Sequence, residues 1–127
     1  MKRKVKLKAY DTISKEIKKI EGFKYIGDKH IEIYYVDNQG RDVTSGYHED
    51  RIVIVMSTGL HDKKGIEIWE GDIVTNGTTK GRVEYCKKYA EYQVIFEMGR
   101  QSLGCYMYHD DIEVIGNVYE SCEDLYK

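Results

Sequence analysis

The chain has 127 residues, a formal net charge of −2 and 41% hydrophobic residues, a size and composition that indicate one globular folding unit. It contains no apolar run near twenty residues, which excludes a transmembrane helix. No apolar stretch follows its basic opening, which excludes a signal peptide, so we expect a cytoplasmic protein. Three widely spaced cysteines, Cys86, Cys105 and Cys122, favour reduced thiols over a disulfide framework or a zinc site.

Charge is distributed unevenly along the sequence. Residues 1–24 contain nine Lys or Arg and three Asp or Glu, a net charge of +6, whereas the remaining residues carry a net charge of −8. The opposed halves could steer an acidic partner onto the N-terminal edge, or could attract each other within one fold or between copies. The basic residues of Lys4–Tyr10 alternate with apolar ones, which favours the second interpretation and predicts a strand with one face in water.

The next elements are read from local periodicity. Ile13, Ile17 and Ile20 have helical spacing and predict a helix over Asp11–Ile20, although a turn at Asp11–Ser14 followed by a strand is the alternative. Clean alternation over His30–Val36, followed by Asp37-Asn38-Gln39-Gly40, predicts a hairpin.

Two further segments come before the signature motif. The polar stretch Arg41–Arg51 predicts a long loop. Arg51–Met56 is too apolar to have one face in water, which places it centrally in the fold.

The C-terminal half reads as a meander of short strands separated by turns. Glycine with Asp or Asn must supply the turns, because the chain has no proline. We predict strands at Ile66–Trp69, Asp72–Val74, Gly81–Tyr85, Gln93–Phe96, Cys105–Tyr108 and Ile112–Tyr119, with turns at 62–65, 70–71, 76–77, 87–90 and 98–99. Strands at this spacing usually close into a small barrel or a two-sheet sandwich.

One segment resembles a known family. Residues 57–74 read Ser-Thr-Gly-Leu-His-Asp-Lys-Lys-Gly-Ile-Glu-Ile-Trp-Glu-Gly-Asp-Ile-Val, which is similar to the signature of the YopX family of phage and prophage proteins. Lys6–Asp11 resembles the family's opening strand and Ile112–Glu120 its closing segment, while Ser57 stands where the family usually has an aromatic residue. The signature positions are Thr58, Gly59, Leu60, Asp62, Gly65, Glu67, Glu70, Gly71 and Asp72.

The resemblance implies a fold and a setting. The fold is α+β and β-rich, with a small N-terminal α/β or β-hairpin subdomain over 1–50 and a small, SH3-like C-terminal β-barrel over 51–127, together forming one folding unit. The setting is a phage or prophage protein in a bacterial host cell. The resemblance implies no catalytic role, so no active-site residues are transferred.

The signature has a structural and a functional interpretation. Structurally, Asp62 accepts a hydrogen bond from its own turn, Gly65 takes a left-handed conformation, and Ile66 and Ile68 face the core with Glu67 outward. Functionally, four carboxylates, those of Asp62, Glu67, Glu70 and Asp72, form an acidic rim for a cation or a basic partner. The structural interpretation accounts for more of the motif.

The twelve tyrosines are the most unusual feature of the composition. Five of them form the predicted interface: Tyr85, Tyr89, Tyr92, Tyr106 and Tyr108. Tyrosine suits protein interfaces, and no catalytic, cofactor or metal constellation is recognisable, so we predict a non-enzymatic accessory protein that binds a protein or further copies of itself. The alternative is a nucleic-acid-binding protein that uses the basic N-terminal residues Lys2, Arg3, Lys4, Lys6 and Lys8 for phosphates and the barrel tyrosines for bases.

Overall fold

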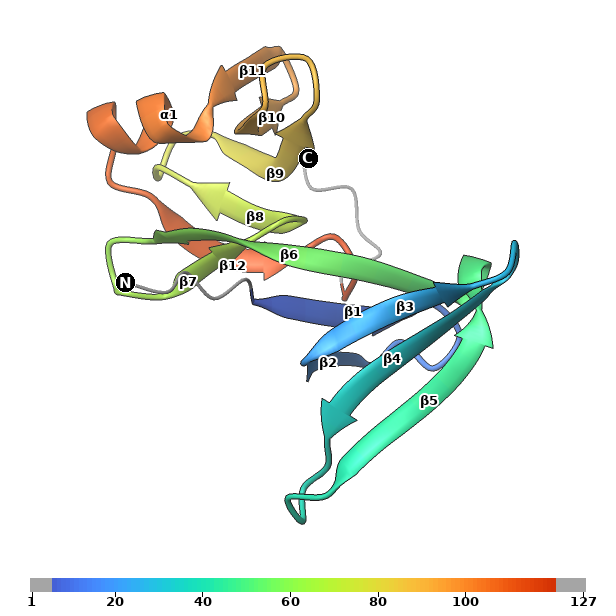
Figure 1. Ribbon diagram of the computed structural model, residues 1–127. Coiled ribbons are helices and arrows are strands. Elements are labelled where there is room, and N and C mark those ends of the chain that lie inside the picture. The colour runs from blue at the N-terminus through green and yellow to red at the C-terminus, as the bar shows by residue number, and fades with distance from the viewer. Residues whose placement is uncertain (1–5, 121–127) are drawn as a thin grey trace. The chain divides into compact units, whose positions relative to one another are not determined.

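The computed structural model describes residues 6–120, and the chain divides into two compact units, Met1–Met56 and Ser57–Lys127 (Figure 1). The first unit contains β1 (Leu7–Asp11), β2 (Ile17–Ile20), β3 (Gly22–Ile26), β4 (His30–Val36), β5 (Asp42–His48), the 3-10 helix η1 (Glu49–Arg51) and the start of β6 (Ile52–His61). The second contains the end of β6, then β7 (Glu67–Trp69), β8 (Asp72–Thr75), β9 (Lys80–Cys86), β10 (Glu91–Phe96), β11 (Gly99–Ser102), α1 (Leu103–His109) and β12 (Glu113–Asn117). In the described residues, no helix is long and apolar enough to cross a bilayer.

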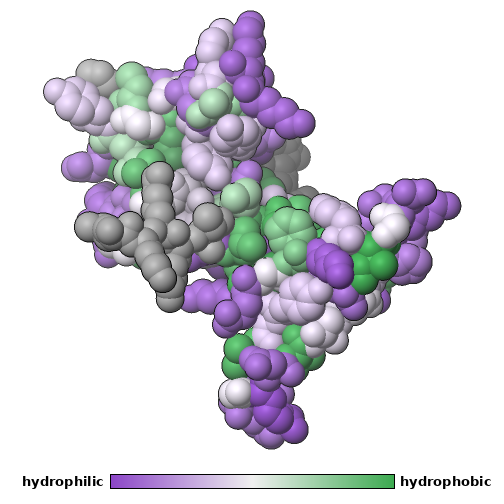
Figure 2. Space-filling model, viewed as in Figure 1, coloured by the Kyte–Doolittle hydropathy of each residue, from purple (hydrophilic) through white to green (hydrophobic). Residues whose placement is uncertain are grey.

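The first unit contains a three-stranded sheet, ordered β3-β4-β5, and the β2-β1-β6 part of a second sheet. All of these strand pairs are antiparallel. The core is formed by Ala9, Ile20, Ile31, Ile33 and Ile52. Apolar side chains also remain exposed, among them Phe23, Tyr25, Ile26 and Val36, and Figure 2 shows hydrophobic patches over the three-stranded sheet.

The prediction of a helix over Asp11–Ile20 is wrong, and the alternative of a turn followed by a strand is confirmed. The Asp11 carboxylate accepts hydrogen bonds from the amides of Ile13 and Ser14, and Lys15 adopts φ 65°, a left-handed conformation that a helix does not allow. Ile13 is 70% exposed, so its helical spacing from Ile17 has no packing role.

One further expectation for the first unit needs correction. Arg41–Arg51 is not a long loop, because Asp42–His48 forms β5 and pairs with β4 along its whole length. The basic N-terminal strand is β1, which lies between β2 and β6 in its sheet. The central position of the apolar segment in β6 and the hairpin after β4 are confirmed.

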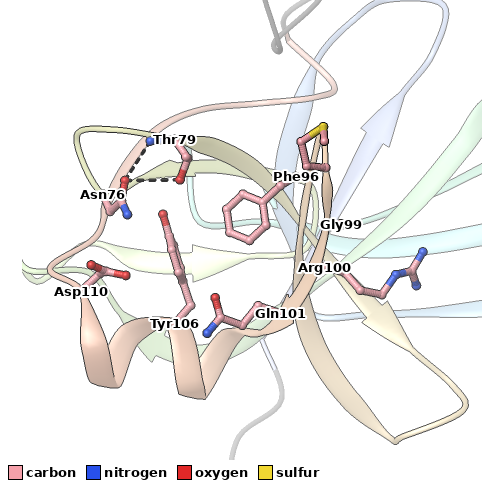
Figure 3. A pocket seen from close by; sticks show the side chains of 9 residues that line it. Asn76, Thr79, Phe96, Gly99, Arg100, Gln101, Tyr106 and Asp110 are labelled. Carbon is pink, nitrogen blue, oxygen red and sulfur yellow. Dashed lines mark hydrogen bonds between the residues drawn. The ribbon is translucent and has the colours of Figure 1, made fainter.

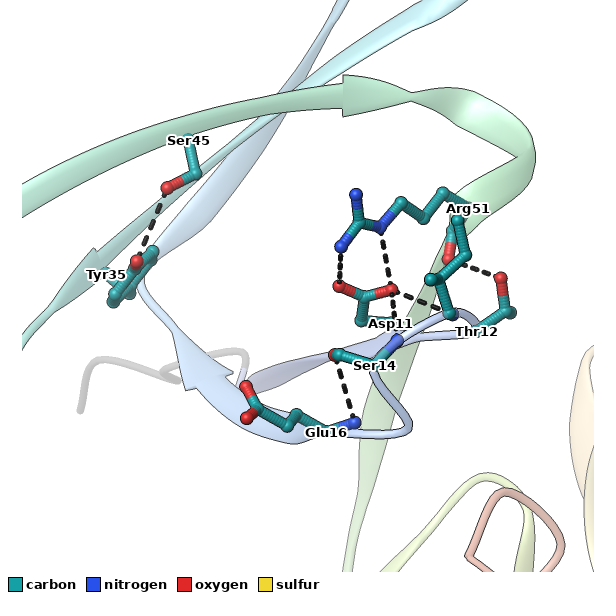
Figure 4. Close-up of polar contacts among 8 residues, drawn as sticks. Asp11, Thr12, Ser14, Glu16, Tyr35, Ser45 and Arg51 are labelled. Atoms are coloured by element: carbon teal, nitrogen blue, oxygen red, sulfur yellow. Dashed lines mark hydrogen bonds and ion pairs between the residues drawn. The ribbon is translucent and has the colours of Figure 1, made fainter.

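A partly buried ion pair joins Asp11, at the end of β1, to Arg51, at the end of η1. The Nε and Nη2 atoms of Arg51 each donate to one carboxylate oxygen of Asp11 at 2.8 Å, and the amide and hydroxyl of Thr12 donate to the Arg51 carbonyl (Figure 4). The Arg51 guanidinium, followed by the amides of Ile13 and Ser14, outweighs the effect of burial and holds the pKa of Asp11 well below its usual range.

We expect Asp11→Asn to lower the free energy of unfolding by about 1–2 kcal/mol, a value reduced for the partial exposure of Arg51. Asparagine keeps an oxygen for the turn amides but loses the bidentate pair. Because the folded pKa is lowered, the contribution is full above the unfolded pKa of about 4 and is lost as the pH falls through the folded value. Urea unfolding at pH 7 and pH 3 measures both effects. The control is Asp37→Asn, which breaks the more exposed Asp37–Arg41 pair; equal losses in the two variants would contradict the prediction.

The second unit contains an antiparallel five-stranded sheet ordered β11-β10-β9-β8-β12. Its core consists of Ile68, Val74, Val83, Val94, Leu103, Tyr106 and Ile112. The described strands form three antiparallel sheets, and none closes into a barrel. The β-rich prediction is confirmed, whereas the α+β description and the SH3-like barrel are not.

The prediction of a strand at Cys105–Tyr108 is wrong, because these residues lie in α1. Leu103, Tyr106 and Met107 have the i, i+3, i+4 spacing of an apolar helical face, and all three pack in the core of the second unit. The turns predicted at Gly65, Gly71, Gly77 and Gly99 are confirmed, and each of these glycines has a positive φ.

Candidate functional site

The signature begins with an irregularity in β6. Gly59 has φ 79°, and the register of β6 against β7 shifts between Ser57 and His61. The Thr58 hydroxyl accepts from the Leu60 amide and donates to the Ile68 carbonyl at 2.6 Å, while the Ser57 hydroxyl donates to Glu67. This part of the motif therefore shapes a β-bulge.

The Asp62 side chain holds the next turn and ties it to a distant strand. Its Oδ1 accepts from the amides of Lys64 and Ile66, both at 2.9 Å, and its Oδ2 accepts from the amide of Val114 in β12 at 3.0 Å. Burial raises the pKa of Asp62, but the three amides and the Lys64 ammonium outweigh it, and the pKa falls below its usual value. Gly65 has φ 82°, as the turn prediction requires. Ile66 is 49% exposed, so its predicted place in the core is wrong, whereas Ile68 is fully buried.

The turn at Glu70 and Gly71 joins β7 to β8 and forms backbone hydrogen bonds with two other segments. The Gly71 amide donates to the Val83 carbonyl, and the Gly71 carbonyl accepts from the Val118 amide, both at 2.8 Å. Asp72 is buried and accepts from the Trp69 amide at 2.8 Å. The ring of Tyr119 packs so close to Gly71 that a Cβ there would lie 2.4 Å from Tyr119 Cε2.

A pocket of about 530 Å³ opens beside this turn, and we call it the signature pocket. Its chemical groups come from the turn, from β9 and from the segment after β12: Glu70, Gly71, Arg82, Glu84, Tyr85 and Tyr119. Arg82 Nη2 lies 3.3 Å from a Glu84 carboxylate oxygen and so offsets part of its charge. The pocket combines two carboxylates, one guanidinium and two phenol rings.

The raised pKa values of Tyr119 and Tyr92, in and beside this pocket, indicate a negative environment. Burial raises the pKa of Tyr119, and the carboxylates of Glu70, Asp72 and Glu84 raise it further. Burial also raises the pKa of the neighbouring Tyr92, with a further contribution from Glu70. Negative charge nearby disfavours the phenolate and favours a cation by the same interaction.

The structure brings together only part of the tyrosine set predicted from sequence. Tyr85 and Tyr92 are paired across β9 and β10, and their ring centroids lie 5.4 Å apart in an edge-to-face arrangement. Tyr89 lies in the loop between those strands and is exposed. Tyr106 is 2% exposed and lies in the core, whereas Tyr108 on α1 is 86% exposed.

The four signature carboxylates do not share one solvated rim. Asp62 and Asp72 are buried and accept hydrogen bonds from the backbone, whereas Glu67 accepts from Ser57 and Glu70 lines the pocket. Within residues 6–120, no three His, Cys, Asp or Glu side chains gather closely enough to hold a metal ion.

Sequence reasoning missed Glu84 and Tyr119 as members of the pocket. Glu84 precedes Tyr85 in a strand and could have been noticed as a charge beside a candidate tyrosine. Tyr119 gives no local signal, because its position depends on the Val118–Gly71 hydrogen bond between distant segments.

Comparisons with known proteins agree on one family and one fold. A family model described as YopX protein matches residues 6–126. The chain is similar to the crystal structure of protein EF1440 from Enterococcus faecalis, with a TM-score of 0.61, 25% identity, and coverage of 94% of this chain and 96% of that one. It is also similar in fold to protein yopX from Bacillus subtilis, with a TM-score of 0.61, 14% identity, and coverage of 96% and 98%. No curated protein matches the chain significantly.

Proposed function

Because the chain belongs to the YopX protein family and its own sequence has no recognisable catalytic motif, we propose that it is a non-enzymatic protein-binding module whose signature pocket receives a basic side chain of its partner. The family name states no activity, so the proposal rests on the pocket. A phage or prophage origin and a cytoplasmic location stay predictions from the sequence.

The proposal is supported by the composition of the pocket, which two carboxylates and two phenol rings line together: those of Glu70, Glu84, Tyr85 and Tyr119. A Lys or Arg side chain gains from both kinds of group, because carboxylates pair with its charge and phenol rings attract it through their π faces. The stem of such a side chain also buries apolar surface against the rings.

A second copy of the chain offers the same chemistry as a foreign partner. Residues 1–24 carry a net charge of +6, and a basic N-terminal segment would suit the negative pocket of a neighbour. Self-association is therefore one form of the proposed binding.

The pocket disfavours the alternative of nucleic-acid binding at this place, because its carboxylates would repel phosphates. The basic residues Lys2, Arg3 and Lys4, on which that alternative also depends, lie outside the described residues. A phosphate-binding role for the N-terminal strand stays a prediction.

The test is a titration with a peptide that copies the first ten residues, Met1–Tyr10, and with the same peptide carrying Gln in place of every Lys and Arg. We expect the basic peptide to shift the amide resonances around Glu70 and Glu84, and its affinity to fall with salt. The double variant Glu70→Gln, Glu84→Gln should weaken binding at least tenfold, which corresponds to ~1.4 kcal/mol.

The control is Glu97→Gln, which makes the same kind of substitution and removes one negative charge from the exposed turn between β10 and β11. It should bind the peptide like the parent. Equal binding by the double variant, or equal binding of the neutral peptide, would disprove the proposed role of the pocket. Sedimentation of the parent and the double variant at several concentrations then distinguishes self-association from binding to another protein.

A further inference from the structure

A second pocket of the same unit contains a buried polar group that the fold leaves without a partner. The pocket has a volume of about 470 Å³ and lies between the β8–β9 turn, the β10–β11 hairpin and α1 (Figure 3). Its lining includes Asn76, Thr79, Phe96, Gln101, Tyr106 and Asp110, and we call it the Tyr106 pocket.

The Tyr106 hydroxyl is the unusual feature of this pocket. The residue is 2% exposed and its hydroxyl makes no hydrogen bond, although it points toward Asn76 and Thr79 in Figure 3. Burial raises the pKa of Tyr106; Thr79 and the backbone of Asn76 offset part of this rise without reaching hydrogen-bond geometry, and the Asp110 carboxylate adds to it. The hydroxyl stays protonated near neutral pH and can donate or accept.

An unpaired buried hydroxyl is costly, which makes a ligand that pairs with it favourable. The hydroxyl lies beneath the turn that contains Asn76 and Thr79. Thr79 is exposed and the hydroxyl is buried, so a bound group reaches the hydroxyl only when this turn is displaced.

The neighbouring groups define the shape and hydrogen bonding of such a ligand. Gln101 donates through Nε2 to Cys105 Sγ, so its carbonyl oxygen is turned toward the space between the rings of Phe96 and Tyr106 (Figure 3). Asn76 uses its carbonyl oxygen for the amides of Thr78 and Thr79, which leaves its two N–H donors on the side of Tyr106. The pocket thus offers amide donors and amide acceptors beside an aromatic wall.

The pocket carries no net formal charge, because it contains one carboxylate, Asp110, and one guanidinium, Arg100. A neutral, planar ligand with adjacent donors and acceptors fits better than an ion. Nucleobases have this character, since Asn and Gln side chains pair with their edges and aromatic rings contact their faces.

We propose that the Tyr106 pocket binds a nucleobase, with Tyr106, Gln101 and Asn76 pairing with its edge and Phe96 contacting its face. The base could belong to a free nucleoside or nucleotide or to a single strand, and these sources share the same recognition chemistry. The inference is independent of the signature pocket and of its partner.

The test is an NMR titration of the full chain with adenosine, guanosine, cytidine and uridine up to ~10 mM, a range that detects weak single-site binding. We expect at least one nucleoside to shift the amide resonances of 76–79 and 101. Tyr106→Phe should weaken that binding about tenfold, the loss expected for one hydrogen bond, while keeping the ring in the core. Its melting temperature should equal or exceed that of the parent, because an unpaired hydroxyl has been removed.

Two further variants make the result decisive. Tyr25→Phe removes the hydroxyl of an exposed tyrosine in the first unit and should leave binding unchanged. Gln101→Leu should weaken binding without altering the core tyrosine. A short single-stranded oligonucleotide that binds far more tightly than any nucleoside, with a steep salt dependence, identifies a strand as the source of the base; similar affinities identify a free nucleoside. No shift with any nucleoside or oligonucleotide, or parent-like binding by Tyr106→Phe, would overturn the inference.

Discussion

Replacing Gly71 with alanine should lower the free energy of unfolding by about 3 kcal/mol. Two costs add at this position. The first is conformational, because φ is 81° and a Cβ disfavours the left-handed region. The second is steric, because the new Cβ would lie 2.4 Å from Tyr119 Cε2 and 2.9 Å from its Cζ.

Gly65 provides the matched control for the conformational cost. It has φ 82°, yet a Cβ built there meets no atom within 4 Å. Gly65→Ala should therefore cost only about 1 kcal/mol. Urea unfolding of both variants measures the difference, which we assign to Tyr119.

A double-mutant cycle isolates the Tyr119 contact. Adding Tyr119→Ala to Gly71→Ala removes the steric conflict, so the second substitution should cost less in this background than in the parent. A Gly71→Ala protein as stable as Gly65→Ala would show that the Tyr119 ring moves aside without loss. Because Gly71 and Tyr119 both line the signature pocket, the same variants should also weaken binding of the basic peptide.

The sequence allowed the turns of this protein to be predicted better than its strands. The turns at Gly40, Gly65 and Gly77 carry a local requirement, a left-handed glycine near an Asp or Asn side chain that accepts from the turn, and five or six residues express it completely. Strand β5 was missed because Thr44, Ser45 and Gly46 lack the apolar alternation of a strand, and their pairing depends on the neighbouring β4. Helix α1 was missed because one short helical face of three apolar residues has nearly the composition of a strand.

The candidate site could be predicted only in part, because it also depends on contacts between segments far apart in the sequence. The residues of the signature could be read from the resemblance, and the turn chemistry of Asp62 and Gly65 follows from local sequence. The pocket depends on strand order, which places β9 beside β8 and brings the segment after β12 against Gly71. No periodicity over residues 57–74 contains that information.

The structure also shows that one turn design occurs twice, once in each unit. In Asp37–Arg41 and in Asp62–Ile66, the aspartate Oδ1 accepts from the amides two and four residues later, and a glycine with positive φ stands three residues later. The two turns differ in the other carboxylate oxygen. Asp37 Oδ2 pairs with the nearby Arg41 at 3.0 Å, whereas Asp62 Oδ2 accepts from Val114, far along the chain.

This difference predicts that Asp62→Ala will lower the free energy of unfolding by about 3 kcal/mol, since it leaves three amides without their charged acceptor. Asp37→Ala, which breaks the same local bonds at an exposed turn, should cost much less. Asp62→Asn should fall between them, because a single amide oxygen cannot serve both the turn and β12. Urea unfolding at pH 7 ranks the three variants.

The pH dependence of the same variants tests the role of the charge. The pKa of Asp62 is lowered in the folded protein, so its contribution is full above the unfolded pKa of about 4 and is lost as the pH falls through the folded value. The stability gap between the parent and Asp62→Ala should therefore narrow on acidification below that pH, whereas a gap caused by lost packing would persist. A gap that stays constant down to pH 2, or equal losses for Asp62→Ala and Asp37→Ala, would show that the link to Val114 does not stabilise the fold.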